Sequence, residues 1–177
     1  MVIKERHHII LEKYPYYEST NKKIMEEISG FNFSRKTPYP TNIEALQYAL
    51  ENNEVTYNMR LVLDWIQRLI EMNNSVTKGA REYGGKSGCT MWFAKYNRGD
   101  YTLSHGHYPF ALYGFVYFVN SPRGSSPLVF STSGKRVKAE EGRVAIFPGN
   151  VYHRVPPNRC ENRIILAGNI GYDLNGI

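Results

Sequence analysis

The sequence predicts a mainly β protein with supporting helices, an α+β chain whose second half forms a jelly roll. From residue 89 onward, short apolar runs alternate with turns rich in Gly, Pro, Asn and Asp, and about eight strands fit into roughly 80 residues. Such a series is typical of a β-sandwich or barrel, and the jelly roll is the member of that class that can hold a metal ion between its sheets. The length of 177 residues fits one domain over 1–177, with 1–88 as mostly helical support and 89–177 as the jelly-roll core.

The first expected helix is short and peripheral. Ser19 or Thr20 can cap its N-terminus, and Gly30 can end it. Its apolar face holds Ile24, Met25 and Ile28. The two prolines of segment 37–40 then disfavour helix and break the chain.

Two further helical patterns follow the prolines. Segment 41–44 matches a capping box ahead of Leu46, Ala49 and Leu50, although the alternation of residues there also permits a strand. The clearest helix runs from Thr56 to Asn73, because its apolar residues recur every three or four positions: Met59, Val62, Leu63, Ile66, Leu69 and Ile70. We expect this helix to support the outside of a sheet and to carry no catalytic residue.

The expected strands begin after a glycine-rich segment, 79–88. They cover 90–96, 101–104, 112–120, 128–131, 136–138, 143–147, 152–155 and 162–169. Segment 79–88 fits an ordinary surface loop, with a mobile flap as the alternative. Because recognition usually sits on loops around a rigid scaffold, we expect a lid or substrate selector at 79–88 or at 120–127.

Composition and charge exclude several classes of protein. The net charge is +6, but Lys and Arg are scattered with no run of four, so we expect a solvated basic surface and no nucleic-acid partner. No apolar stretch reaches the roughly 20 residues that a membrane helix needs. The charged N-terminal segment does not fit a signal peptide. We therefore expect a cytoplasmic protein with no membrane partner, in which Cys89 and Cys160 are reduced thiols, with a single bridge between them as the alternative.

Three histidines form a candidate metal site. His105 and His107 are one residue apart in an expected strand, where side chains at i and i+2 share a face. His153 lies in another expected strand and is the natural third ligand, because the two remaining histidines are near the N-terminus. Three nitrogen donors with open positions suit a first-row transition metal, whereas a closed structural zinc site has four ligands. The alternative is that all three are ordinary packed or surface histidines.

Arg163 is a candidate anion-binding residue. It opens the last expected strand, and inside a jelly roll its charge would be uncompensated unless an anion meets it. A dicarboxylate fits this requirement, because a guanidinium group can pair with a carboxylate through two hydrogen bonds. Tyr96, in the strand that precedes the histidine pair, could donate a hydroxyl hydrogen bond to the same oxygens.

Several motifs in this order resemble the 2-oxoglutarate and Fe(II)-dependent oxygenases. The resemblance covers about residues 89–170 and is nearest to the prolyl 4-hydroxylase-like branch and its small bacteriophage-encoded members. The matching segments are Tyr96-x-x-Gly99-Asp100, His105-x-His107, 113–120, 127–130, 142–149, and His153 followed by Arg163.

The resemblance implies a cupin-like jelly roll, the double-stranded β-helix, and a role for each matched residue. His105 and His153 would bind Fe(II), Arg163 would bind the distal carboxylate of 2-oxoglutarate, and Tyr96 would assist it. At His107 the chain departs from the usual pattern, which has an aspartate, so the site would lack its carboxylate ligand. The implied reaction uses 2-oxoglutarate and O2 to hydroxylate an unidentified peptide, protein or small molecule.

Two other functions fit the same residues. The first is a cupin-like three-histidine metalloenzyme that binds its substrate directly to the metal and does not use 2-oxoglutarate. The second is a non-catalytic jelly-roll binding module with a vestigial site. The sequence does not identify the primary substrate or the oligomeric state.

Overall fold

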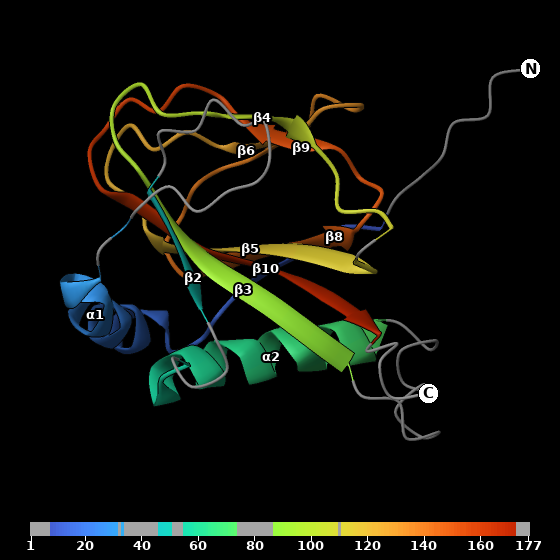
Figure 1. Ribbon diagram of the computed structural model, residues 1–177, viewed down its shortest axis with the longest axis horizontal. Helices are drawn as coiled ribbons and strands as arrows, with labels where there is room; N and C mark the ends of the chain where they lie inside the picture. The colour runs from blue at the N-terminus through green and yellow to red at the C-terminus, as the bar shows by residue number, and fades with distance from the viewer. Residues whose placement is uncertain are drawn as a thin grey trace, which may run out of the picture.

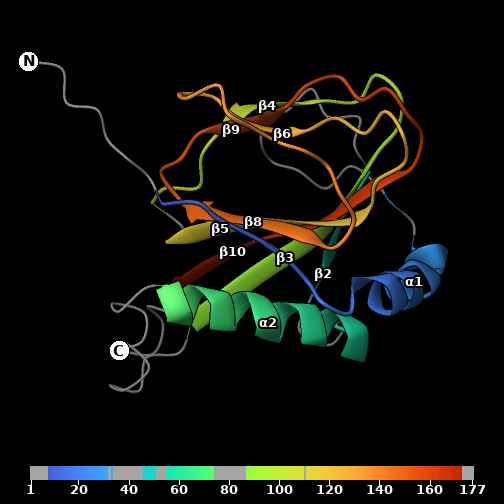
Figure 2. The same ribbon diagram turned by 180° about the vertical axis from the view of Figure 1, so that it is seen from behind.

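Two antiparallel β-sheets lie face to face in the computed structural model, and two helices cover the outer face of the larger sheet (Figure 1). The structure describes residues 8–31, 33, 46–50, 55–73, 87–109 and 111–172. The helices are α1 (Tyr17–Glu27), continued by the short 3-10 helix η1 (Ile28–Gly30), and α2 (Tyr57–Asn73). The same three layers are seen from behind in Figure 2.

The larger sheet has six strands in the order β1-β8-β5-β10-β3-β2. Their bounds are β1 Ile10–Lys13, β8 Arg143–Pro148, β5 Tyr113–Asn120, β10 Arg163–Tyr172, β3 Ser87–Tyr96 and β2 Leu46–Leu50. The central strand β10 pairs with β3 along its whole length, from Arg163 opposite Tyr96 to Tyr172 opposite Ser87. On its other side β10 pairs with β5, with one irregularity between Ile164 and Ile165.

The smaller sheet has four short strands in the order β4-β9-β6-β7. Their bounds are β4 Thr102–His105, β9 His153–Val155, β6 Leu128–Phe130 and β7 Arg136–Val137. Its inner face packs against β3, β5, β8 and β10, and the apolar residues between the two sheets form one of the two cores of the protein. His105, His153 and Arg163 therefore belong to strands that enclose this core.

Strand alternation divides the buried side chains between the two cores. On β10, Ile164, Leu166 and Ile170 pack with the helices, where Met59, Val62 and Ile66 of α2 are fully buried. Ile165 and Ala167 point the other way and pack between the sheets. Because neighbouring residues of a strand face opposite sides, the position of a residue in β10 indicates which core it meets.

The predicted mainly β architecture and the two principal helices are confirmed. All eight predicted strands form, with ends that agree or differ by at most three residues. The helix predicted from Thr56 forms as α2, and its stripe is buried as expected. The predicted cap of α1 was wrong, because the helix begins earlier, at Tyr17, with no side-chain cap. The chain turns into α1 directly after Tyr14, whose ring is buried in the core.

The helix predicted around Leu46, Ala49 and Leu50 was also wrong, and the alternative strand is what forms. Segment Leu46–Leu50 is β2, which pairs antiparallel with β3 at the edge of the larger sheet. The backbone groups on that side of β3 need partners, and this requirement overrides a local helical pattern. Segments 37–40, 41–44 and 79–86 lie outside the described residues.

Within the first 88 residues, β1 and β2 form the two edges of the larger sheet. Within the described part of the chain, no helix is long and apolar enough to cross a membrane. Cys89 and Cys160 are both free thiols, as expected.

Candidate metal centre

Strand pairing brings two of the three histidines together. In the smaller sheet β4 lies beside β9, and His105 is directly opposite His153. The centroids of their rings are 4.4 Å apart. His153 is buried and 4% exposed, whereas His105 is half-buried at the end of β4.

His107 reaches the same point by a different route from the one predicted. It was expected on the same strand face as His105, but β4 ends at His105 and His107 lies in the following turn. The backbone N–H groups of His107 and Tyr108 both donate to the carbonyl oxygen of Gly149, over 2.7 and 3.0 Å. This pair of bonds folds the chain back, so that Nε2 of His107 lies 3.4 Å from Nε2 of His153.

A glycine on the opposite sheet makes room for the His107 ring. A Cβ atom at Gly114 of β5 would lie 3.2 Å from Cδ2 of His107 and 2.8 Å from the Phe147 ring. Both contacts are closer than ordinary packing allows. The position of His107 therefore depends on the absence of a side chain at residue 114.

Two of the histidines have their tautomer set by the backbone. Nδ1 of His105 lies 2.9 Å from the carbonyl oxygen of Leu103, and Nδ1 of His153 lies 3.1 Å from that of Val151. A carbonyl oxygen only accepts, so each Nδ1 carries the proton and donates it. Each Nε2 then keeps its lone pair, which is the arrangement that metal-binding histidines use.

Burial keeps the three imidazoles neutral. Desolvation lowers the pKa of His105, and desolvation together with the charge of His105 lowers that of His107 to about 4. For His153, burial first and the two other histidines second lower the pKa to about 3. Protons are therefore poor competitors for these nitrogens near pH 7, and metal binding requires the neutral form.

The geometry fits a shared metal ion. One nitrogen from each of the three rings lies within 4.8 Å of the others. Two imidazole nitrogens at about 2.1 Å from one ion are themselves about 3.0 to 3.4 Å apart for angles between 90° and 109°. The Nε2 atoms of His107 and His153 are 3.4 Å apart, at the upper end of this range. His105, His107 and His153 are the only group of this kind among the described residues.

Arg163 lies in the same inter-sheet core with its charge unpaired. Its side chain is 0% exposed, and Nε, Nη1 and Nη2 have no hydrogen-bond acceptor among the described residues. The rings of Tyr96 and Phe118 lie 4.5 and 5.5 Å from its guanidinium carbon. Burial lowers the pKa of Arg163, and the nearby Tyr96 hydroxyl and Cys160 thiol offset only part of this effect. A buried guanidinium that keeps its proton needs an anion.

Tyr96 is next to Arg163, as its position opposite Arg163 in the β3–β10 ladder requires. Its hydroxyl group, however, is hydrogen-bonded to Oγ1 of Thr102 over 2.7 Å. Its ring covers the guanidinium group, which is a cation–π contact. Tyr96 could therefore orient Arg163 through its ring as well as donate its hydroxyl hydrogen to a ligand.

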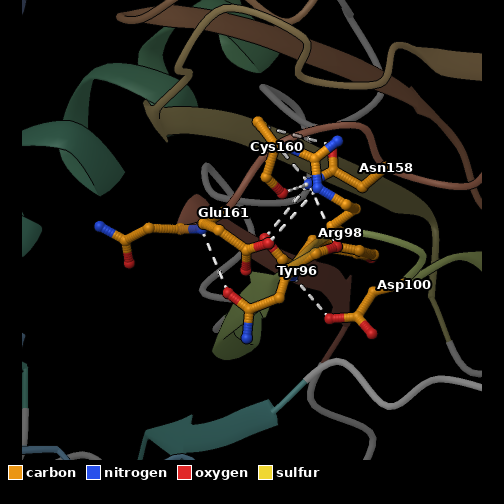
Figure 3. Close-up of polar contacts among 8 residues, drawn as sticks. Tyr96, Arg98, Asp100, Asn158, Cys160 and Glu161 are labelled. Atoms are coloured by element: carbon orange, nitrogen blue, oxygen red, sulfur yellow. Dashed lines mark hydrogen bonds and ion pairs between the residues drawn. The ribbon is translucent and has the colours of Figure 1, made fainter.

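A polar network around Asn158 lies beside Tyr96, the strand partner of Arg163 (Figure 3). Nδ2 of Asn158 donates to the carbonyl oxygens of Tyr96 and Cys160 over 3.2 and 2.8 Å, and its Oδ1 accepts from the backbone N–H of Ser126. Its backbone groups bond to Gly99 and Asp100. Segment 120–127, one of the two segments expected to form a lid, is attached to this network through Ser126. It follows the end of β5 that lies near Arg163, whereas Gly114 and His107 lie at the other end of that strand.

No protein-family model matches this sequence, and no curated protein matches it. Solved structures do. A prolyl 4-hydroxylase from Pseudomonas putida is 16% identical with a TM-score of 0.71, and the alignment covers 93% of this chain and 92% of that one. A viral collagen prolyl hydroxylase from Paramecium bursaria Chlorella virus-1, solved with 2OG, is 13% identical with a TM-score of 0.66, covering 90% and 94%.

A prolyl hydroxylase from Trichoplax adhaerens, solved with a peptide of hypoxia inducible factor, is 13% identical with a TM-score of 0.65. That alignment covers 91% of this chain and 82% of the other. The chain shares the fold of these three structures. The predicted jelly-roll core is thereby confirmed, and the three histidines and Arg163 face the inside of this jelly roll.

The sequence did not single out three residues that this jelly roll places beside the histidines. Gly114 lies under His107, the Trp92 ring centroid is 6.4 Å from that of His107, and Asn169 is the strand partner of Gly114. Strand alternation could have indicated Asn169. On the predicted last strand it is separated by two, four and six residues from Ala167, Ile165 and Arg163, so all four side chains lie on the same face.

Proposed function

We propose that this protein is a non-haem Fe(II) and 2-oxoglutarate-dependent oxygenase, a hydroxylase similar to the prolyl hydroxylases. The observation that carries the proposal is the unpaired, fully buried charge of Arg163 in the same core as three convergent imidazoles. The three imidazoles supply a site for a metal cation, and Arg163 supplies a fixed positive charge for an anion. A viral collagen prolyl hydroxylase of the same fold was solved with 2OG, which supports 2-oxoglutarate as the anion.

Each residue has a separate task in this proposal. His105, His107 and His153 hold Fe(II) through three neutral nitrogens and leave further coordination positions open. Arg163 pairs with the distal carboxylate of 2-oxoglutarate, and Tyr96 assists by covering the guanidinium and by its hydroxyl group. When bound, Fe(II) and 2-oxoglutarate supply the oxidising chemistry with O2, and the products are succinate, carbon dioxide and a hydroxylated substrate.

Dianionic 2-oxoglutarate offsets most of the positive charge of the proposed complex. Three neutral imidazoles leave the 2+ charge of iron uncompensated, so iron and 2-oxoglutarate together are formally neutral, and Arg163 makes the whole site +1. Arg163 adds a positive charge at the end of the core where the second carboxylate would lie, and no described carboxylate competes with it. We infer that the site retains free iron less firmly than a site with a carboxylate ligand, and that 2-oxoglutarate strengthens iron binding.

The primary substrate is a peptide, a protein side chain or a small molecule, and a peptide has direct support from one neighbour of the same fold, which was solved with a peptide. The proposed test is anaerobic titration with Fe(II) and then 2-oxoglutarate. We expect a weak visible charge-transfer band on addition of 2-oxoglutarate, and succinate after oxygen is admitted. A protein that gives neither the band nor succinate would contradict the proposal.

A three-histidine metalloenzyme that does not use 2-oxoglutarate is the second candidate, favoured by the lack of a carboxylate in the histidine group. Arg163→Ala separates the two functions. It should abolish the charge-transfer band in an oxygenase that uses 2-oxoglutarate, and it should not affect a reaction that needs metal and substrate alone. A purified protein that binds none of Fe(II), Mn(II) and Ni(II) would instead favour a non-catalytic binding module.

A further inference from the structure

Beside the histidines lies a small subsite that neither metal binding nor co-substrate binding uses. We propose that Asn169 and Trp92 recognise the primary substrate, which presents a hydrogen-bond donor, N–H or O–H, to Asn169 and a flat apolar face to Trp92. This inference rests on the proposed function, because it assigns these groups to the substrate of the same site.

Strand alternation places Asn169 on the inner face of the jelly roll. On β10, Ile165 and Ala167 point into the inter-sheet core, so Asn169, two residues further on, points the same way. Its neighbour Gly168 faces the helix side, where a Cβ atom would meet the Phe115 ring at 2.5 Å. The strand partners of Asn169 are Gly114 on β5 and Thr90 on β3.

These pairings bring Asn169 close to His107. A Cβ atom at Gly114 would be 3.2 Å from the His107 ring, so that ring lies over Gly114. Directly opposite residues of an antiparallel pair are about 4.5 to 5.5 Å apart, which puts Asn169 beside the same spot. Trp92 is the partner of Ala167 and therefore lies diagonal to Asn169, with its ring centroid 6.4 Å from that of His107.

The carboxamide oxygen of Asn169 is an acceptor without a donor. Oδ1 is buried and has no hydrogen-bond partner among the residues that the structure describes. The buried amide of Asn21 behaves differently, because its Oδ1 accepts from Tyr117 and its Nδ2 donates to Val119. Asn158 likewise uses both ends of its side chain. A buried amide oxygen left unpaired is unfavourable, so a donor from outside the chain is the expected partner.

This end of the core is separate from Arg163, and exposed side chains lie near it. Arg163 and Asn169 are six residues apart on one strand, which corresponds to roughly 20 Å. A co-substrate held at Arg163 therefore leaves Asn169 for another molecule. Thr90, Tyr108 and Tyr152 are exposed near this end, and the Tyr152 ring lies against Gly106, the residue between His105 and His107.

The test uses two small probes that differ in the donor. Benzamide has a flat ring and an amide N–H, whereas N,N-dimethylbenzamide has the ring and no N–H. Each is titrated by saturation-transfer NMR into the full chain loaded with Zn(II) in place of Fe(II), with 2-oxoglutarate present. We expect the parent protein to bind benzamide about fivefold more tightly, the effect of one neutral hydrogen bond.

Three variants make the result specific. Asn169→Leu should remove the preference, Asn169→Asp should retain it because a carboxylate still accepts, and Trp92→Ala should weaken both probes. Asn73→Leu makes the same substitution at the exposed end of α2 and should leave the preference intact. Equal affinity of the parent for the two probes, or no binding of either, would overturn the subsite. Absence of 2-oxoglutarate-dependent succinate from the parent would overturn the proposed function instead, and the two failures are thereby distinguished.

Discussion

Arg163 carries a positive charge where no described group neutralises it, and this makes its replacement informative. Arg163→Met keeps much of the side-chain volume and removes the buried charge. We expect the free protein to become more stable by about 1 kcal/mol or more, because an unpaired buried charge is a large cost. We also expect the variant to lose the stabilisation that 2-oxoglutarate gives the parent, since ligand binding to the folded state raises its stability.

Urea denaturation with and without 2-oxoglutarate, in the presence of Fe(II) without oxygen, measures both effects. Lys95→Met replaces a half-buried cation on β3 and is the control, which should keep the response to 2-oxoglutarate. A less stable Arg163→Met protein that still responds to 2-oxoglutarate would mean that the charge is compensated and that the anion binds elsewhere.

His107 is the residue at which the candidate metal site has an imidazole in place of a carboxylate. His107→Ala removes one of three donors, so we expect it to lose metal retention and 2-oxoglutarate turnover together. His107→Asp restores an anionic oxygen ligand, and we expect it to retain iron at least as well as the parent. Iron content after desalting and succinate release measure these outcomes. Parent levels of iron and succinate in His107→Ala would show that two histidines suffice.

At the scale of elements, β5 and the turn after β4 must approach closely for the histidines to converge. Gly114→Ala would place a Cβ atom 3.2 Å from the His107 ring and 2.8 Å from the Phe147 ring. The contact with Phe147 is the shorter one, and the Phe147 ring centroid lies 4.5 Å from that of His153, so we expect a shift of either ring to disturb the histidine group. Metal affinity should fall by about tenfold or more, as it does when groups that orient a ligand are changed.

Competition with a chromophoric chelator measures that affinity. Gly30→Ala is the control, because a Cβ atom there would have nothing within 4 Å, and it should leave metal affinity unchanged. If Gly114→Ala binds metal as the parent does while its thermal stability is also unchanged, the close approach of β5 does not determine the position of His107.

For the whole molecule, the sequence predicted those features that depend on local periodicity. The eight strands and α2 follow from alternation and from the three-to-four-residue spacing of Met59 to Ile70. Segment Leu46–Leu50 was misassigned because its structure is decided by the open edge of β3, which lies more than 40 residues further along the chain. Such long-range pairing leaves little local signal.

The candidate site shows the same division. His105, His153 and Arg163 were expected in strands, and β4, β9 and β10 contain them. His107 converges with His105 and His153 for a reason that the sequence pattern did not contain, namely two hydrogen bonds to Gly149 from a turn. Gly114 and Asn169 were missed because their relation to His107 exists only through the pairing of β5 with β10. Register between distant strands, rather than residue type, was the missing information.

The three histidines also couple the stability of the metal-free protein to pH. Their pKa values are lowered on folding, to about 4 for His107 and about 3 for His153, mainly by burial. Below the ordinary histidine value of about 6.5, the unfolded chain therefore binds protons that the folded protein does not. Stability is greatest above that pH and is lost as the pH falls from about 6.5 toward 4, with a slope of up to about 1.4 kcal/mol per pH unit for each histidine.

Chelator-treated protein should accordingly show a urea midpoint that decreases steadily between pH 7 and pH 5. His153→Gln removes one of the responsible groups, so we expect a shallower decrease, whereas Tyr152→Phe changes only a hydroxyl on the neighbouring exposed ring and should follow the parent. The slope decides the matter irrespective of the absolute stability of each variant, because a cavity or a lost contact shifts the whole curve without changing its pH dependence. A His153→Gln curve parallel to that of the parent would show that this histidine is not held neutral by the fold, and the pre-formed neutral nitrogen required for metal binding would then be absent.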